Sequence, residues 1–343
     1  GDTYRLMGKY EEALTDLNRA IALDEKDASA IAARGETYRQ MDMCEEALAD
    51  FTHAFELDEK HAMAIARRGA TYRQMGKYEE ALADLNRAIE LDEKYVWAIA
   101  RRGETYRLMD KYEEALADLN RAIELDDKDA WAIVSRGETY RQMDKYEEAV
   151  MDFTRAIELN EKNAWAIARR GATYRQMDKY EAALADLNRA IELDEKDAGA
   201  MASRGDIYRM MGMYEEALAD RKRVIELDPV DASDHSALAA CYRNLGFMDE
   251  YHRHIAIARE SIAKESEYSR ACFEAICGNV DEALALLRIA LEKREESVGW
   301  ARSDPDFEVF RNDPRFAALL DEMDARSKEV DAVDRATGGQ TAE

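Results

Sequence analysis

A glycine recurs every 34 residues through most of the chain. The series is Gly1, Gly35, Gly69, Gly103, Gly137, Gly171 and Gly205. A tyrosine follows each of the first six glycines by three positions, and the segment ALADLNRAIELDEK occurs twice, at 81–94 and 183–196. A strict period of this length is typical of a linear array of small structural units.

Each period contains two apolar patterns of helical spacing. One runs through Ile99, Gly103 and Tyr106, and the next runs through Ala115 and Leu119. Two helices of about a dozen residues cannot bury both of their faces alone, so each unit must stack on its neighbours. Short polar links such as LDEKDA favour tight turns between the units. The sequence therefore predicts an all-α fold, a solenoid of stacked 34-residue helix-turn-helix repeats.

The repeated residues resemble those of a known family. They read Ile31-x2-Arg34-Gly35-x2-Tyr38, followed by Ala47-x3-Phe51. This pattern is similar to the tetratricopeptide repeat, W-x2-L-G-x2-Y…A-x3-F. The resemblance is to arrays in bacterial multidomain proteins that end in a closing segment. It implies a right-handed α-solenoid whose first helices line a concave groove.

The periodicity also suggests the domain organisation. Residues 1–231 form the array, a partial first repeat and six full repeats, and residues 232–297 form two degenerate repeats. Asp304-Pro305 and Asp313-Pro314 have the residue order of helix starts, so we expect capping helices over 298–326. Residues 327–343 have the composition of a disordered tail. Because Gly1 corresponds to Gly35, we expect the chain to be a fragment of a longer protein.

The composition disfavours several classes of function. The formal net charge is −25, which repels phosphates and disfavours nucleic acid as a partner. The sequence has neither a run of 18 apolar residues nor a signal peptide, so we expect a cytoplasmic protein with no membrane contact. The four cysteines and five histidines are scattered, and no nucleophile, phosphate-loop or metal-binding motif is present. We expect a non-enzymatic protein without metal or cofactor.

Basic and aromatic residues recur on one predicted helix face. If the repeats stack in order, residues one period apart become neighbours and form columns. The candidate groove residues are Arg73, Arg107, Arg141, Arg175, Arg209, Trp97, Trp131, Trp165, Lys111 and Lys145. Tryptophan and arginine are enriched among residues that dominate binding energy. The predicted function is a protein–protein interaction module whose groove binds an acidic peptide or protein segment.

Alternatives remain open at this stage. The arginines could instead pair with Glu104 or Glu138 along their own helices, and the tryptophans could pack against the next repeat. The module could also be the sensor or autoinhibitory arm of a larger bacterial signalling or defence protein. Self-association through an apolar end of the array is a further hypothesis.

A second arginine series lies on the side that stacking covers. Its members stand one helix away from aspartates placed between small core residues. Opposite charges facing one interior are costly unless they pair. The structural ion pairs that we expect are Arg102 with Asp118, Arg136 with Asp152, and Arg170 with Asp186.

Overall fold

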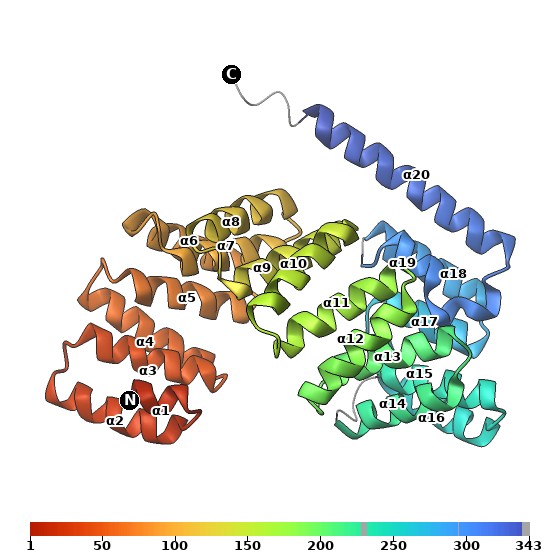
Figure 1. Cartoon of the computed structure of the whole chain (residues 1–343), viewed down its shortest axis with the longest axis horizontal. Helices are drawn as coiled ribbons and strands as arrows, with labels where there is room; N and C mark the ends of the chain where they lie inside the picture. The colour runs from red at the N-terminus through yellow and green to blue at the C-terminus, as the bar shows by residue number, and fades with distance from the viewer. Residues whose placement is uncertain (228–231, 294, 338–343) are drawn as a thin grey trace. The chain divides into compact units, whose positions relative to one another are not determined.

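Each 34-residue period folds as two antiparallel helices joined by a tight turn (Figure 1). The computed structural model describes residues 1–227, 232–293 and 295–337. All regular structure in these residues is helical, and they contain no strand. The predicted all-α solenoid of helical hairpins is therefore confirmed.

The helices divide between two units, Gly1–Asn160 and Glu161–Glu343. The first unit contains α1 (Asp2–Leu6), α2 (Tyr10–Leu23), α3 (Ala28–Gln40), α4 (Cys44–Leu57), α5 (Ala62–Gln74), α6 (Tyr78–Leu91), α7 (Val96–Leu108), α8 (Tyr112–Leu125), α9 (Ala130–Gln142) and α10 (Tyr146–Leu159). The repeats of the second unit are α11 (Ala164–Gln176), α12 (Tyr180–Leu193), α13 (Ala198–Met210) and α14 (Tyr214–Leu227). After them come α15 (Ala232–Leu245), α16 (Met248–Ser261), η1 (Ile262–Lys264), α17 (Glu267–Cys277), α18 (Val280–Glu292), α19 (Val298–Ser303), η2 (Pro305–Phe310) and α20 (Pro314–Thr337).

Local sequence explains where the helices begin and turn. The Asp27 side chain accepts a hydrogen bond from the Ala30 backbone N–H, which caps the start of α3. Between the two helices of a repeat the backbone takes a left-handed conformation, with φ of 72° at Gly76 and 57° at Asp110. Glycine adopts this conformation freely and aspartate tolerates it, so these two residue types share the position along the array.

The two helices of one repeat approach each other closely at the recurring glycine. A Cβ atom added to Gly103 would lie 2.9 Å from Cγ of Leu119 and 3.2 Å from the carbonyl oxygen of Ala115. Large side chains from both helices of each hairpin fill the remaining space. The fully buried ones include Ile31, Phe51, Ile65, Leu85, Ile99, Leu119, Ile133, Ile167 and Leu187.

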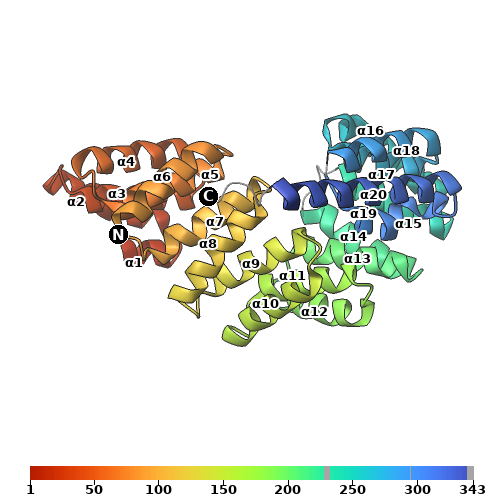
Figure 2. The ribbon, with the colours of Figure 1, turned by 90° about the horizontal axis from the view of Figure 1, so that it is seen from above.

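First helices of successive repeats also contact one another. In the first unit α3 touches α5, α5 touches α7, and α7 touches α9. Figure 2 shows the succession of hairpins from above. Side chains on these first helices therefore form a shared face, on which equivalent residues of neighbouring repeats lie side by side.

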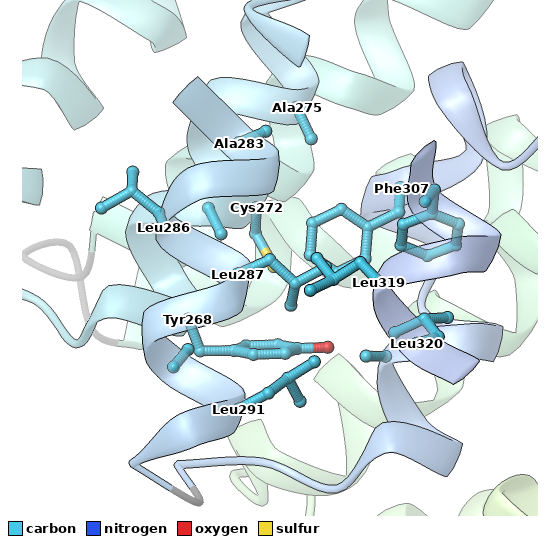
Figure 3. Close-up of a cluster of buried hydrophobic side chains, with 14 of the residues drawn as sticks. Tyr268, Cys272, Ala275, Ala283, Leu286, Leu287, Leu291, Phe307, Leu319 and Leu320 are labelled. Atoms are coloured by element: carbon cyan, nitrogen blue, oxygen red, sulfur yellow. The ribbon is translucent and has the colours of Figure 1, made fainter. Parts of the chain in front are cut away.

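A distinct core closes the second unit. Tyr268 and Cys272 of α17, Leu287 of α18, Phe307 of η2 and Leu320 of α20 are buried together (Figure 3). As the sequence suggested, the Asp304 side chain caps the start of η2 by accepting from the Asp306 backbone N–H at 2.8 Å. The C-terminal segment 298–326 is thus folded onto the degenerate hairpins.

Part of the segment 327–343 belongs to the last helix. Helix α20 continues through residues 327–337, and residues 338–343 lie outside the described residues. The segment SKEVDAVDRAT is polar but contains no glycine or proline, so nothing in it opposes continuation of the helix.

Candidate binding surface

Arg102 and Asp118 join the two helices of one repeat. Arg102 donates from Nε to Asp118 Oδ2 and from Nη2 to Asp118 Oδ1, both at 2.7 Å. The hydrogen bond to Asp118 raises the pKa of Arg102 despite the cost of burial. Its remaining Nη1 donates to Asn86 Oδ1 of the preceding repeat at 2.7 Å. The same two-pronged contact joins Arg34 to Asp50, Arg68 to Asp84, Arg136 to Asp152, Arg170 to Asp186, and Arg204 to Asp220.

Arg107 is engaged within its own helix. Its Nε and Nη2 donate to the two carboxylate oxygens of Glu104 at 3.0 and 2.8 Å, and Nη1 donates to Gln142 of the next repeat. Burial lowers the pKa of Arg107, but the hydrogen bond and charge of Glu104, together with the charge of Glu138, outweigh burial and the net shift is upward. Arg39 and Arg141 make the same bidentate pair with Glu36 and Glu138.

The expected groove arginines therefore do not form a column of equivalent free cations. Arg107 and Arg141 follow the alternative of pairing along the helix. In the second unit, Arg175 pairs with Asp206 at 2.6 Å and the buried Arg209 pairs with Asp306 at 2.7 Å. Where a helix carries an acid three residues before the arginine, the two side chains pair within that helix.

Lys111 and Lys145 lie apart from these pairs. Each is exposed and immediately precedes a second helix, α8 or α10. They stand at the turn of the hairpin, where a long side chain remains in solvent.

Arg73 is the exception among the first-unit arginines of this series. Its helix has Ala70 where α7 has Glu104, so no carboxylate stands three residues before it. The Arg73 guanidinium makes no hydrogen bond or ion pair within the described residues, and its Nε is buried without a partner. Burial lowers the pKa of Arg73; the Glu104 charge opposes this, whereas Arg39 and Arg107 lower the pKa further.

Arg101, on the first helix α7 of the following repeat, is also a buried arginine with a lowered pKa. Burial lowers its pKa to about 10, and Arg73, Arg39 and Arg67 act in the same direction against Glu104. Its guanidinium carbon lies 3.5 Å from the ring centroid of Trp131, a cation–π contact. The Arg101 guanidinium makes no hydrogen bond or ion pair in the described part of the chain.

The tryptophans stack on arginines rather than on one another. The guanidinium carbon of Arg67 lies 3.9 Å from the ring centroid of Trp97, and Trp97 and Trp131 are both half-buried. In the second unit, Trp165 is 41% exposed and lies 5.9 Å from Arg169. We use the name unit-1 arginine cluster for Arg67, Arg73 and Arg101 together with Trp97 and Trp131.

Sequence reasoning missed Arg67 and Arg101. They precede the ion-paired Arg68 and Arg102 by one residue, and the repeat spacing predicted a role only for the second arginine of each pair. A usable signal was present in the acids: glutamate occupies positions 36, 104 and 138, whereas alanine occupies 70 and 172. That pattern marks the helices in which no acid three residues before the arginine can pair with it.

A buried acidic group lies in the second unit, near Arg209. Sγ of Cys272 and carboxylate oxygens of Asp304 and Asp306 lie within 4.8 Å of one another. Burial, aided by the Asp306 charge, raises the pKa of Asp304 to about 7, and the Tyr268 hydroxyl donates to Asp304 at 2.8 Å (Figure 3 labels Tyr268 and Cys272). The Arg209 guanidinium pairs with Asp306 of this group at 2.7 Å.

Taken together, the geometry defines a helical-repeat protein with a face of arginine and tryptophan. Models described as TPR repeat (residues 1–42) and Tetratricopeptide repeat (residues 62–95, 95–162, 164–197 and 198–231) match more than half of the chain. The chain belongs to the tetratricopeptide repeat family. A search of curated protein sequences found no match.

Solved structures share the fold. The crystal structure of the APC/C hetero-tetramer Cut9–Hcn1 matches with a TM-score of 0.64 at 18% identity, covering 70% of this chain and 47% of that one. A tetratricopeptide repeat protein from Parabacteroides merdae matches with a TM-score of 0.56 at 21% identity, covering 69% and 93%. PilF of Pseudomonas aeruginosa matches with a TM-score of 0.52 at 19% identity, covering 60% and 93%. This chain therefore spans about half the length of the first of these.

Such repeat arrays are in general protein–protein interaction modules, and the chain is one of them. Within the described residues, no helix combines the length and the apolar character needed to cross a bilayer.

Proposed function

We propose that the chain binds an acidic peptide or protein segment, without catalysis, on the unit-1 arginine cluster. The carrying observation is that the guanidinium groups of Arg73 and Arg101 are largely buried and have no ion-pair partner within the described residues, and that Trp97 and Trp131 pack on Arg101. A desolvated arginine without a partner is costly, and a ligand carboxylate would relieve that cost through charge-assisted hydrogen bonds.

The electrostatic setting favours an anion at this place. The strongest charged neighbours of Arg101 are three arginines and one glutamate, although the chain as a whole carries a net charge of −25. An acidic partner is repelled by most of the surface, so the cluster fixes where it binds and in which orientation. Of the groove residues expected from sequence, Arg73, Trp97 and Trp131 stay in the proposal.

Ala70→Glu provides the sharpest test. It places a carboxylate three residues before Arg73, at the position where Glu36, Glu104 and Glu138 already make such pairs in neighbouring repeats. The fold therefore accommodates this side chain in closely similar repeats. The new carboxylate pairs with Arg73 within α5, so Arg73 is no longer available to bind a ligand.

The experiment selects binders to the intact chain from a displayed library of 12-residue peptides. We expect enrichment of aspartate and glutamate, and at least tenfold weaker binding of a selected acidic peptide to Ala70→Glu. The matched control is Arg87→Gln, because Arg87 is exposed on the second helix α6 and pairs with Glu90; its binding should equal wild type. Selected peptides without acids, or unchanged affinity for Ala70→Glu, would refute the proposal.

A further inference from the structure

Two first helices of this chain contain the same eleven residues. IARRGATYRQM occurs at 65–75 in α5 and again at 167–177 in α11, so Arg73 and Arg175 are equivalent residues of equivalent repeats. Neither helix has an acid three residues before the arginine. Differences between the surroundings of Arg73 and Arg175 therefore come from the segments that pack against the two helices.

In the second unit, the chain itself covers the repeated site. The guanidinium carbon of Arg175 lies 4.1 Å from the ring centroid of Trp300, in α19. One repeat on, Arg209 pairs with Asp306 of η2 and is only 4% exposed. Burial lowers the pKa of Arg209, but Asp306, Cys241 and Asp206 together more than offset burial, so the net shift is upward.

The segment 298–310 thus supplies two chemical groups to two successive arginines. An indole covers the first guanidinium, and a carboxylate six residues later neutralises the second. Its acids are Asp304, Asp306 and Glu308, against the single base Arg302. Arg175 obtains its own carboxylate from Asp206 of the next repeat, which lies at 2.6 Å.

In the first unit, the equivalent site has no such cover. Arg73 has neither an aromatic ring over it nor an ion pair within the described residues; burial lowers its pKa and the charge of Glu104 only partly opposes this. Arg107, the equivalent of Arg209, is already paired with Glu104, whereas Arg101 has no ion-pair partner in the described part of the chain and packs on Trp97 and Trp131. The indole that covers Arg175 in α11 is therefore the group that Arg73 in α5 lacks.

We propose that the partner of the unit-1 arginine cluster is a protein segment that carries, besides a carboxylate, an aromatic side chain that covers Arg73 as Trp300 covers Arg175. The inference rests on the proposed acidic-segment binding and adds the aromatic requirement. The carboxylate binds Arg73 and Arg101, and the aromatic ring lies against the exposed arginine and tryptophan faces.

The probe is a synthetic peptide of residues 298–310, blocked at both ends, titrated into the intact chain by calorimetry. We expect saturable binding that weakens at least tenfold when the peptide carries Trp300→Ala, and equally when it carries Asp306→Asn. Binding should also weaken at least tenfold with the Ala70→Glu chain and remain unchanged with Arg87→Gln.

The possible results separate the two proposals. If the peptide binds the Ala70→Glu chain as tightly as wild type, it is replacing the chain's own segment in the second unit, and the inference is overturned. If Trp300→Ala leaves the peptide's affinity intact while Ala70→Glu abolishes it, the aromatic requirement is wrong and acidic binding stands. Absence of any binding by the peptide overturns the inference, whereas the proposed function depends on the library selection.

Discussion

Arg102 holds Asp118 through two parallel hydrogen bonds of 2.7 Å and, with its third nitrogen, reaches Asn86 one repeat back. Arginine is suited to this arrangement because its planar group donates in several fixed directions at once. The contact therefore ties two helices within a repeat and also joins neighbouring repeats. A leucine at this position, common in the family, would pack but could not make these bonds.

Replacing Arg102 or Asp118 with alanine should each lower the free energy of unfolding by about 2–3 kcal/mol, because each leaves a buried polar group unpaired. The double variant should reveal a coupling energy of about 1–2 kcal/mol. Urea denaturation followed by circular dichroism measures both quantities. The exposed pair Arg87 and Glu90 serves as control, with expected coupling below about 0.5 kcal/mol; equal coupling in the two cycles would contradict this role.

Gly103→Ala should destabilise the chain by about 1–3 kcal/mol, because the added methyl group would lie 2.9 Å from Leu119 and 3.2 Å from a backbone oxygen. Gly205→Ala is the matched control, since its nearest neighbour would be Arg221 Nε at 3.4 Å. In that helix the change should be neutral or stabilising by up to about 1 kcal/mol. Thermal melts of the two variants should therefore shift in different directions, and similar losses in both would disprove the close-approach explanation.

The pKa of Asp304, raised to about 7 by burial beside Asp306, predicts a pH-dependent stability. Between about pH 4 and pH 7 the unfolded chain loses this proton while the folded chain retains it, so stability falls as pH rises and levels off above pH 7. Asp304→Asn mimics the protonated carboxyl and should remove that part of the decline. Denaturation midpoints measured from pH 5 to pH 8 test this, and parallel profiles for the two proteins would exclude Asp304 as the cause.

Glu104→Gln should strengthen the binding of a selected acidic peptide by about three- to tenfold. The substitution removes a negative charge near Arg73 and Arg101 and releases Arg107 from its bidentate pair. Calorimetry at low salt measures the gain, and high salt should reduce it through screening. Glu90→Gln on α6 is the control; a gain of the same size there would attribute the effect to net charge alone.

The sequence allowed the fold to be predicted because its constraint is periodic. Residues one period apart experience the same packing, so hairpins, their turns and the placement of Arg102 opposite Asp118 all follow from the spacing. A column of arginines available to a ligand could not be predicted reliably from the same spacing. An arginine such as Arg107 has the same spacing whether it faces solvent or bonds to Glu104, and only side-chain geometry decides between the two.

The docking of the C-terminal segment could not be foreseen either. Trp300 and Asp306 lie outside the periodic region, so no spacing relates them to Arg175 or Arg209. The helix starts at Asp304 and Asp313 were readable because capping is local. Their long-range partners depend on how α19 and η2 pack against α13 and α17, which local sequence does not specify.

The hydrogen bond from Arg102 to Asn86 also affects how the number of repeats can change during evolution. Asn18, Asn86, Asn120 and Asn188 each accept a hydrogen bond from the arginine of the following repeat, whereas threonine occupies positions 52 and 154. Unequal recombination that adds or deletes one whole period between repeats that carry the asparagine should leave these contacts intact. Variation in repeat number among related genes is then expected to be tolerated, whereas losses that cut a period in mid-hairpin should be eliminated.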